Sequence, residues 1–219
     1  MKEYKAYLFD FDYTLADSSS GITLCFHRTC AELGCRDWPD EKLLPLIGMP
    51  MREAIAAVIG DTDDDAISRF HDAYRKIADR EMTRHTHFYP DTLPVLRSIK
   101  GHGSHAAVIS TKTRARIMEK FDGDHVAGLI DFVIGCEDVT ELKPSPEGIL
   151  LAISRLQIAR EDAIYVGDSL YDANAAANAG IDFAAVLTGT TPAGDFAPLP
   201  HVAIMARLGE LMEECLDFG

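Results

Sequence analysis

The sequence predicts an α/β fold, a doubly wound parallel sheet with an inserted all-α subdomain, and two observations support this prediction. Over most of the chain, short apolar segments typical of fully buried strands alternate with segments of helical length and period. This alternation indicates a mostly parallel sheet with right-handed crossovers and helices on both faces. One long interval near the N-terminus contains helical patterns only, which indicates an insertion.

The first predicted strand, residues 5–9, is short, apolar and rich in aromatic residues, as a fully buried strand is. Four later segments share this character, at residues 105–110, 131–136, 163–168 and 181–187, and a last short strand is expected at residues 201–205. Helices are expected at residues 112–122, 146–157 and 171–179, the last of which ends at Gly180. The prolines and glycines of residues 188–200 indicate an irregular loop, and a helix is expected near the C-terminus.

The interval from about residue 18 to residue 84 contains four helical patterns, at residues 18–34, 39–46, 49–59 and 62–84. Two of them end at a glycine, as helices often do. The interval is far too long for a loop between a strand and its next helix. We therefore assign residues 17–85 to an inserted helical cap, and residues 1–16 and 86–219 to the α/β core.

The composition is that of an ordinary soluble globular protein, with 47% hydrophobic and 26% charged residues among 219. No apolar run approaches the roughly 18 residues of a membrane span, and acidic residues interrupt the N-terminus before a signal-peptide core could form. We therefore expect a cytoplasmic protein without a membrane partner. The net charge of −14 repels nucleic acid, and an anionic substrate would need a local positive charge or a metal.

Polar residues stand where the predicted strands end, and ligands of open parallel sheets bind beyond the carboxyl ends of the strands. A lysine in the stretch "ELKPSPEG" could reach the same edge. The set combines three carboxylates, two hydroxyls and one ammonium. Its members are Asp10, Asp12, Ser110, Thr111, Lys143 and Asp168.

These residue types suit phosphoryl transfer. Carboxylates and backbone oxygens form the oxygen-only sites that Mg²⁺ prefers. A carboxylate can also attack phosphorus and form an aspartyl-phosphate, which splits one difficult step into two easier ones. A lysine and a hydroxyl can then hold the transferring group, because this catalysis consists mostly of positioning and electrostatics.

Four motifs occur in a fixed order: "DFDYT" followed by Leu15, "VIST" at the end of the second strand, "LKPSP", and "VGDSLYD". Together they resemble the four motifs of the haloacid dehalogenase-like hydrolases. The sequence is similar in particular to the phosphoglycolate-phosphatase-like branch, which has a helical cap inserted after the first motif. The resemblance implies a Rossmann-like core and a Mg²⁺-dependent phosphatase that hydrolyses a small phosphorylated metabolite.

The resemblance also implies a role for each matching residue. Asp10 would be the nucleophile that forms the aspartyl-phosphate, and Asp12 would be the general acid and base. Ser110 and Lys143 would bind the phosphoryl group. Thr111 would join them, although relatives usually have Asn at its position.

For the metal, the resemblance implies that Mg²⁺ is held by Asp10, by the backbone carbonyl of Asp12 and by Asp168. Asp172, one helical turn beyond Asp168, would support these ligands. Arg52, on an expected cap helix, could contact the distal part of an anionic substrate. An ordinary surface arginine explains Arg52 equally well, so both interpretations stay open.

One position departs from the family pattern. The first motif usually has Gly before the Thr, and this chain has Tyr13 there. Because a tyrosine prefers an ordinary backbone conformation, we expect a differently shaped loop. The change should affect access to the pocket more than the chemical step.

Three alternative functions stay open: a sugar phosphomutase, a pyrophosphatase of the same superfamily, and a phospho-acceptor or binding protein without turnover. The mutases that this chain resembles carry a His near the start of the first cap helix, where residues 20–23 are Ser-Gly-Ile-Thr. Substrate identity depends on cap side chains whose geometry the sequence does not reveal. A monomer and a homodimer are both compatible with the sequence.

Overall fold

The computed structural model describes residues 2–215 and contains a six-stranded sheet. All neighbouring strands in this sheet are parallel, which confirms the predicted class. The strand order, from one edge to the other, is β5 (Phe132–Ile134), β4 (His105–Ile109), β1 (Ala6–Phe9), β6 (Ala163–Gly167), β7 (Asp182–Val186) and β8 (Ala203–Met205).

The central strand β1 shows why the sequence builds this sheet. Its side chains alternate between the two faces: Tyr7 and Phe9 join one apolar cluster, and Ala6 and Leu8 join the other. All four residues have no exposed surface, so both faces of the sheet are covered. A continuous apolar run is therefore the expected sequence for this strand.

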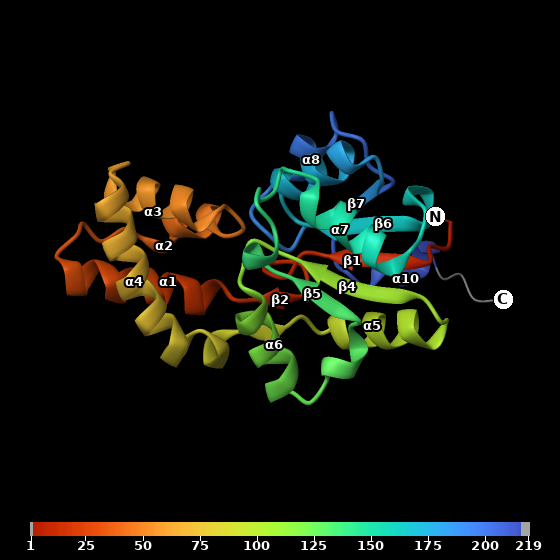
Figure 1. Ribbon diagram of the computed structural model, residues 1–219, viewed down its shortest axis with the longest axis horizontal. Helices are drawn as coiled ribbons and strands as arrows, with labels where there is room; N and C mark the ends of the chain where they lie inside the picture. Colours follow the sequence, from red (N-terminus) through yellow and green to blue (C-terminus); the bar gives the residue numbers. More distant parts are fainter. Residues whose placement is uncertain (1, 216–219) are drawn as a thin grey trace.

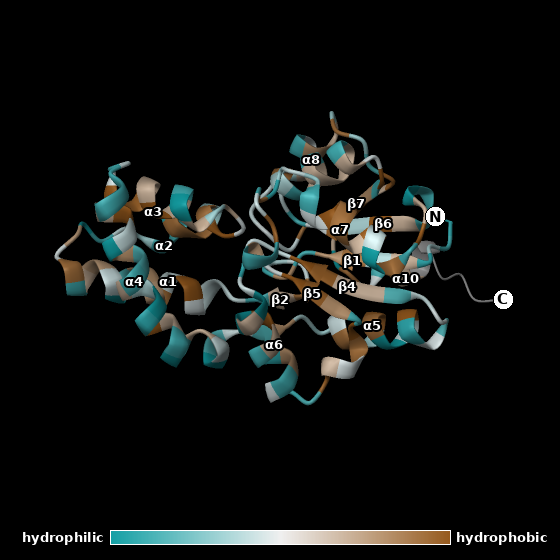
Figure 2. Ribbon diagram, in the orientation of Figure 1, coloured by the Kyte–Doolittle hydropathy of each residue, from teal (hydrophilic) through white to brown (hydrophobic). Residues whose placement is uncertain are grey.

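Helices cover the two faces of the sheet, as a doubly wound fold requires (Figure 1). One face carries α5 (Thr92–Gly101), α6 (Arg114–Gly123) and α10 (Glu210–Cys215). The other carries α7 (Glu147–Leu156), α8 (Leu170–Ala179) and α9 (Ala193–Phe196). Figure 2 shows hydrophobic strands between helices whose colours alternate between hydrophobic and hydrophilic.

The cap follows the first strand in sequence and lies beside the core, at the left of Figure 1. Its helices are α1 (Ser19–Leu33), α2 (Asp40–Leu43), α3 (Met51–Ile59) and α4 (Asp64–Glu81). They enclose an apolar cluster of their own, in which the Phe26 ring packs on Tyr74 with ring centroids 5.0 Å apart. Helices α1 and α3 end where predicted, because Gly34 and Gly60 adopt positive φ.

Two short strands connect the cap to the core. β2 (Ala16–Asp17) and β3 (His87–Phe88) form an antiparallel pair at the points where the chain leaves and re-enters the core. The Thr92 hydroxyl fastens this crossing by donating a hydrogen bond to the Leu15 carbonyl, at 2.6 Å. These strands could not be predicted from the sequence, because segments of two residues show no periodicity.

The other differences from the predicted elements are local. The segment predicted as an irregular loop, residues 188–200, contains the short helix α9, for which Pro192 is the N-cap. Helix α5 was not predicted either, and its Pro94 lies in the first turn, where a missing N–H is tolerated. Short 3₁₀ segments occur at Leu44–Leu46, Thr83–His85, Ala127–Leu129, Cys136–Asp138 and Arg160–Asp162. Among the described residues, no helix has both the length and the apolar character needed to cross a bilayer.

Candidate active site

The polar residues that follow β1, β4 and β6 come together at one edge of the sheet. The Asp10 amide donates to the Val166 carbonyl at 2.9 Å, and the Ser110 amide donates to the Ile134 carbonyl at 3.0 Å. Each backbone therefore continues the strand pairing by one residue before it turns away. Asp10, Ser110 and Asp168 are all buried there, at 1%, 6% and 5% exposure.

Lys143 lies at the centre of this group. Its ammonium is 2.9 Å from Asp10 Oδ1 and 2.5 Å from Asp172 Oδ1, and it donates to the Tyr165 hydroxyl at 3.2 Å. Burial by itself lowers the pKa of a lysine, but the carboxylates of Asp10 and Asp172 outweigh it and hold the pKa of Lys143 well above 10.5. Lys143 is therefore a permanent buried cation.

The first turn of α8 fixes Asp172. Its Oδ2 accepts hydrogen bonds from the Ser169 amide at 3.0 Å and from the Ser169 hydroxyl at 2.6 Å, as part of a capping box. Its Oδ1 faces Lys143. Because both carboxylate oxygens have protein partners, Asp172 is suited to orient Lys143 and its neighbours.

Asp10 and Asp168 are buried acids with few partners. Burial is the main cause that raises the pKa of Asp10 from 3.8 to about 6. The Lys143 ammonium lowers this pKa, and the Asp172 and Asp12 carboxylates raise it further. Burial, together with Asp172 and Asp10, raises the pKa of Asp168 well above its usual value. The Thr14 hydroxyl donates to Asp168 Oδ1 at 3.2 Å.

These acids fit a divalent cation. One carboxylate oxygen from each of Asp10, Asp168 and Asp172 lies within 4.8 Å of the others. Asp10 Oδ1 is buried and, apart from the nearby Lys143 ammonium, receives no well-aligned hydrogen bond from the described residues. An all-oxygen donor set with an incompletely satisfied buried oxygen suits Mg²⁺. The side chain of Asp12 is not part of this cluster, and the predicted metal set used only its backbone carbonyl.

Asp12 has a different environment. Both of its carboxylate oxygens accept hydrogen bonds from the Lys112 ammonium, at 2.7 and 2.8 Å. Lys112 follows β4, and its side chain is only 11% exposed. Asp12 and Lys112 both line the space between core and cap, whereas Asp10 and Asp168 do not.

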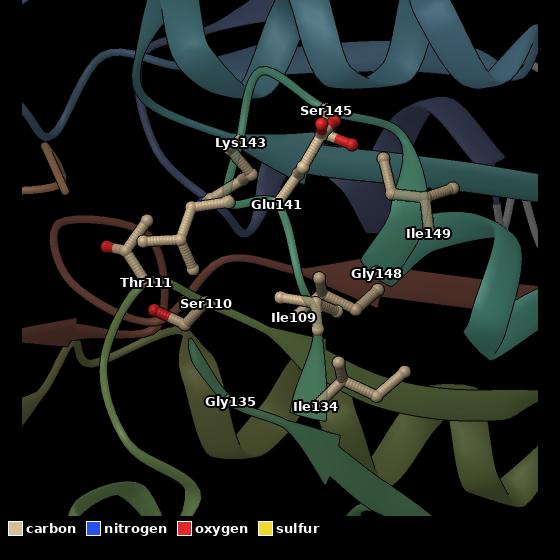
Figure 3. Close-up of a pocket in the computed structure, with 12 residues that line it drawn as sticks. Ile109, Ser110, Thr111, Ile134, Gly135, Glu141, Lys143, Ser145, Gly148 and Ile149 are labelled. Carbon is tan, nitrogen blue, oxygen red and sulfur yellow. The ribbon is translucent and has the colours of Figure 1, made fainter. Parts of the chain in front are cut away.

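Ser110, Thr111 and Lys143 line a small cavity at the strand ends (Figure 3). Its volume is about 10 Å³, about enough for one water molecule. The Ser110 hydroxyl accepts a hydrogen bond from the Lys112 amide at 3.3 Å. The Thr111 hydroxyl donates to the Gly48 carbonyl of the cap at 3.2 Å, so it connects the two parts of the molecule.

The structure does not bring Arg52 to this site. Arg52 lies on α3 with 59% of its side chain exposed and forms an ion pair with Asp64 of α4. It is also not among the residues that line the space between core and cap. Its pairing within the cap agrees with the interpretation of Arg52 as a surface residue.

The expectation that Tyr13 has an ordinary backbone conformation is wrong. Its φ is +58°, in the left-handed region that favours glycine. The surrounding structure holds this geometry: the Tyr13 amide donates to the Ala16 carbonyl at 2.8 Å, and Thr188 donates to the Tyr13 carbonyl. The buried side chain packs into the apolar cluster of the cap. Packing therefore offsets the strain, and the loop keeps the shape that a glycine would allow.

Several residues of the site, Lys112, Thr14 and Gly189, were not predicted from the sequence. Lys112 directly follows the "VIST" motif, and its position next to Thr111 was the signal that could have revealed it. The hydrogen bond from Thr14 to Asp168 and the close approach of Gly189 to Asp168 join segments that are distant in the sequence. A Cβ at Gly189 would lie 2.0 Å from Asp168 Oδ2, so only glycine permits this close approach.

The chain matches the model of a known protein family over most of its length. The family model for haloacid dehalogenase-like hydrolases matches residues 7–186. The chain belongs to this family. This match confirms the resemblance to haloacid dehalogenase-like hydrolases that the four motifs indicated.

Curated relatives of this hydrolase include proteins named for two different activities. A pyrophosphatase PpaX from Bacillus velezensis is 30% identical over 185 residues, which cover 84% of each chain. A phosphoglycolate phosphatase from Aquifex aeolicus is 30% identical over 83% of this chain and 84% of its own. Among solved structures, a haloacid dehalogenase-like hydrolase from Bacteroides fragilis is 42% identical, with a TM-score of 0.92, and covers 95% of this chain and 100% of its own.

Proposed function

We propose that this hydrolase is a Mg²⁺-dependent phosphatase that releases phosphate from a small phosphorylated metabolite through an aspartyl-phosphate on Asp10. The observation that carries the proposal is the position of Asp10. This buried carboxylate lies at the end of the central strand, 2.9 Å from a permanent cation and beside two further acids that suit a divalent metal. Curated relatives named as phosphatases and pyrophosphatases support the same chemistry.

In the first step, a carboxylate oxygen of Asp10 attacks phosphorus and the bond from phosphorus to the substrate oxygen breaks. Asp12, in its protonated form, gives its proton to that oxygen as the alcohol leaves. Asp12 suits this role because it follows Asp10 by two residues and faces the space between core and cap. The products of the step are the free alcohol and a phosphorylated Asp10.

In the second step, Asp12, now a carboxylate, takes a proton from a water molecule while the water oxygen attacks phosphorus. The bond from phosphorus to Asp10 then breaks, which releases inorganic phosphate and restores both acids. Lys112 contacts both oxygens of the Asp12 carboxylate and would fix its orientation between the two steps.

Asp10, Asp168 and the backbone carbonyl of Asp12 would hold the Mg²⁺, which would neutralise charge on the phosphoryl oxygens. Lys143 would offset the negative charge between nucleophile and phosphate, and Asp172 would keep Lys143 in place. Ser110 and Thr111 would add hydroxyl donors to the phosphoryl group. Thr111 would first have to release the Gly48 carbonyl.

We propose that residues 17–85 act as a cap that closes over the core formed by residues 1–16 and 86–219. Two contacts between the parts support this: the Tyr171 hydroxyl donates to Glu53 at 3.1 Å, and Arg116 pairs with Asp79 at 2.5 Å. Closure would exclude bulk water during phosphoryl transfer. A cytoplasmic location, and a monomer or homodimer, also belong to this proposal.

A phosphate-release assay over a panel of phosphorylated metabolites, with Mg²⁺ or with EDTA, tests the function. We expect release with Mg²⁺ only, and none from Asp10→Asn. The matched control Asp122→Asn changes an exposed aspartate on α6 and should keep wild-type turnover. Release by Asp10→Asn at the wild-type rate would rule out Asp10 as the nucleophile.

The same panel tests the alternatives of the same superfamily. The pyrophosphatase relatives make inorganic pyrophosphate a required member of the panel. A hexose 1-phosphate that yields the 6-phosphate without free phosphate would indicate a mutase. A stable phospho-Asp10 without phosphate release would indicate a phospho-acceptor.

A further inference from the structure

A large cavity lies between cap and core, separate from the small cavity of Figure 3. Its volume is about 530 Å³. At one end it meets the core residues Asp12, Thr111 and Lys112. Its other walls are formed mainly by cap residues from α1, α3, α4 and the segment that precedes α3.

The proposed chemistry determines what enters this cavity, and the inference therefore rests on the proposed function. The leaving oxygen of the substrate must lie near Asp12, which protonates it. Asp12 is part of the cavity wall, whereas Asp10 is not. The alcohol part of the substrate must consequently extend from Asp12 into the cavity.

The volume of the cavity exceeds what a very small alcohol needs. Cavities of roughly 300–1,000 Å³ typically enclose ligands of drug size. The leaving groups of phosphoglycolate and pyrophosphate consist of only a few atoms, and either would leave most of the 530 Å³ unfilled. The size of the cavity thus favours an alcohol of about the size of a ring system.

The walls of the cavity are largely apolar. Phe26 of α1, Tyr74 of α4 and Ala54 of α3 line it, together with Met51 of α3 and Met49 just before this helix. Methionine side chains adapt to the shape of a ligand and make favourable contacts with aromatic rings. A polar group placed against these apolar side chains would lose its hydration without gaining hydrogen bonds from them, whereas an apolar group would not.

One cation of the cavity forms no ion pair with the described side chains. Lys112 is paired with Asp12, and Arg116 is paired with both Asp79 and Glu119. Arg75, by contrast, lines the cavity without a carboxylate within ion-pair distance among the described side chains, those of residues 2–212. It is thus the cation that remains available to a ligand.

Arg75 lies one helical turn after His71 on the same face of α4, and both line the cavity. Burial is the main cause that lowers the pKa of His71, and the nearby Arg75 charge lowers it further. The imidazole is therefore neutral near neutral pH. His71 can therefore share a hydrogen bond with an anion without adding charge. The two side chains place a positive charge and a hydrogen-bonding imidazole side by side on the α4 wall of the cavity.

We propose that the substrate is the phosphate monoester of an alcohol built on an aromatic ring, or on an apolar group of similar size, with an anionic group at its distal end that Arg75 binds. Such a molecule places its phosphate at Asp10, its apolar body against Phe26 and the methionines, and its distal anion at α4. This class differs from the phosphoglycolate and pyrophosphate named for the relatives.

A series of alkyl phosphates with similar leaving-group acidity tests the proposal. The series is methyl phosphate, benzyl phosphate and 4-carboxybenzyl phosphate, each assayed for phosphate release with Mg²⁺. Burial of an apolar group gains about fourfold in affinity per methylene, so kcat/KM for benzyl phosphate should exceed that for methyl phosphate by about 100-fold or more. The carboxylate should add about another tenfold, because hydrogen bonds to charged groups are strong.

Two pairs of variants locate the effect. Ala115→Phe fills the cavity from an exposed position of α6, and it should lower kcat/KM for benzyl phosphate at least about tenfold without lowering that for methyl phosphate. Its control, Ala57→Phe, changes an exposed alanine of α3 outside the cavity. Arg75→Gln should remove the advantage of the carboxylate, whereas Arg80→Gln on the same helix, outside the cavity, should keep it.

The outcomes separate this inference from the proposed function. If methyl phosphate, phosphoglycolate or pyrophosphate is turned over as well as benzyl phosphate, the inference is wrong and the phosphatase function stands. If no ester releases phosphate, the proposed function fails, and calorimetry with benzylphosphonate and methylphosphonate still decides the inference. Tighter binding of benzylphosphonate, lost in Ala115→Phe, supports it, and equal binding overturns it.

Discussion

The substitution Lys143→Met tests how the site is held together. Among the described residues, Lys143 is the one cation within ion-pair distance of Asp10 and Asp172, and its side chain is only 5% exposed. Methionine has a similar length and fills the same space, so the main change is the loss of charge. Asp10, Asp168 and Asp172 would then be buried together without a neighbouring cation.

The expected loss of stability follows from this burial. Removing one partner of a buried ion pair costs about 3–5 kcal/mol, because the remaining charge is left uncompensated. For a chain of this length, 1 kcal/mol corresponds to a change in Tm of about 2–4 °C. In EDTA, Lys143→Met should therefore melt about 6–20 °C below the wild type.

Differential scanning calorimetry in EDTA measures this loss, and a second substitution checks its cause. If uncompensated charge is the cause, the double variant Lys143→Met with Asp10→Asn should recover at least about 1 kcal/mol of the loss. The control Lys5→Met removes an exposed ion pair with Asp162 and should melt close to the wild type. A Lys143→Met variant as stable as the wild type, or a double variant less stable than Lys143→Met, would refute the reasoning.

Two further predictions concern metal and acid. The pKa of Asp10 is raised to about 6 in the folded protein. In EDTA, the folded protein should therefore lose stability as the pH rises from about 4 through 6 and Asp10 ionises. Stabilisation by Mg²⁺ should grow over the same pH range, because the metal binds the ionised carboxylate. Thermal melts that show an equal Mg²⁺ effect at pH 5 and pH 7.5, or an undiminished effect in Asp168→Asn, would contradict this. Lys112→Met should lower kcat about 10- to 100-fold, because Asp12 loses both of its hydrogen bonds, whereas Lys120→Met on α6 should retain wild-type kcat. Steady-state kinetics that show equal kcat for these two variants would exclude a positioning role for Lys112.

The sequence predicted those parts of the fold that depend on local patterns. Strand β1 is a short apolar run because both of its faces are covered, and α8 ends at Gly180 because the chain turns there at φ +70°. The edge residues Asp10, Ser110 and Asp168 could be named because the carboxyl ends of parallel strands meet at one edge. Each of these inferences needs only the period of the sequence and the chemistry of single residues.

The remaining features depend on contacts between distant segments. Lys112 and Asp12 are 100 residues apart and meet only because β1 and β4 are neighbours in the sheet. Tyr13 adopts a conformation that its own preference disfavours, since hydrogen bonds and packing around it determine the backbone. The pairing of Arg52 with Asp64 likewise depends on how α3 and α4 pack. No local pattern carries such information.

The central claim is that Asp10 becomes phosphorylated during turnover. The most direct test is to mix the enzyme with a turned-over phosphate ester and Mg²⁺, stop the reaction with acid within one turnover, and locate the phosphoryl group by peptide mass spectrometry. We predict an acyl phosphate on Asp10 that is absent from Asp10→Asn and disappears as phosphate is released. A phosphoryl group on another residue, or phosphate release by Asp10→Asn, would contradict the claim.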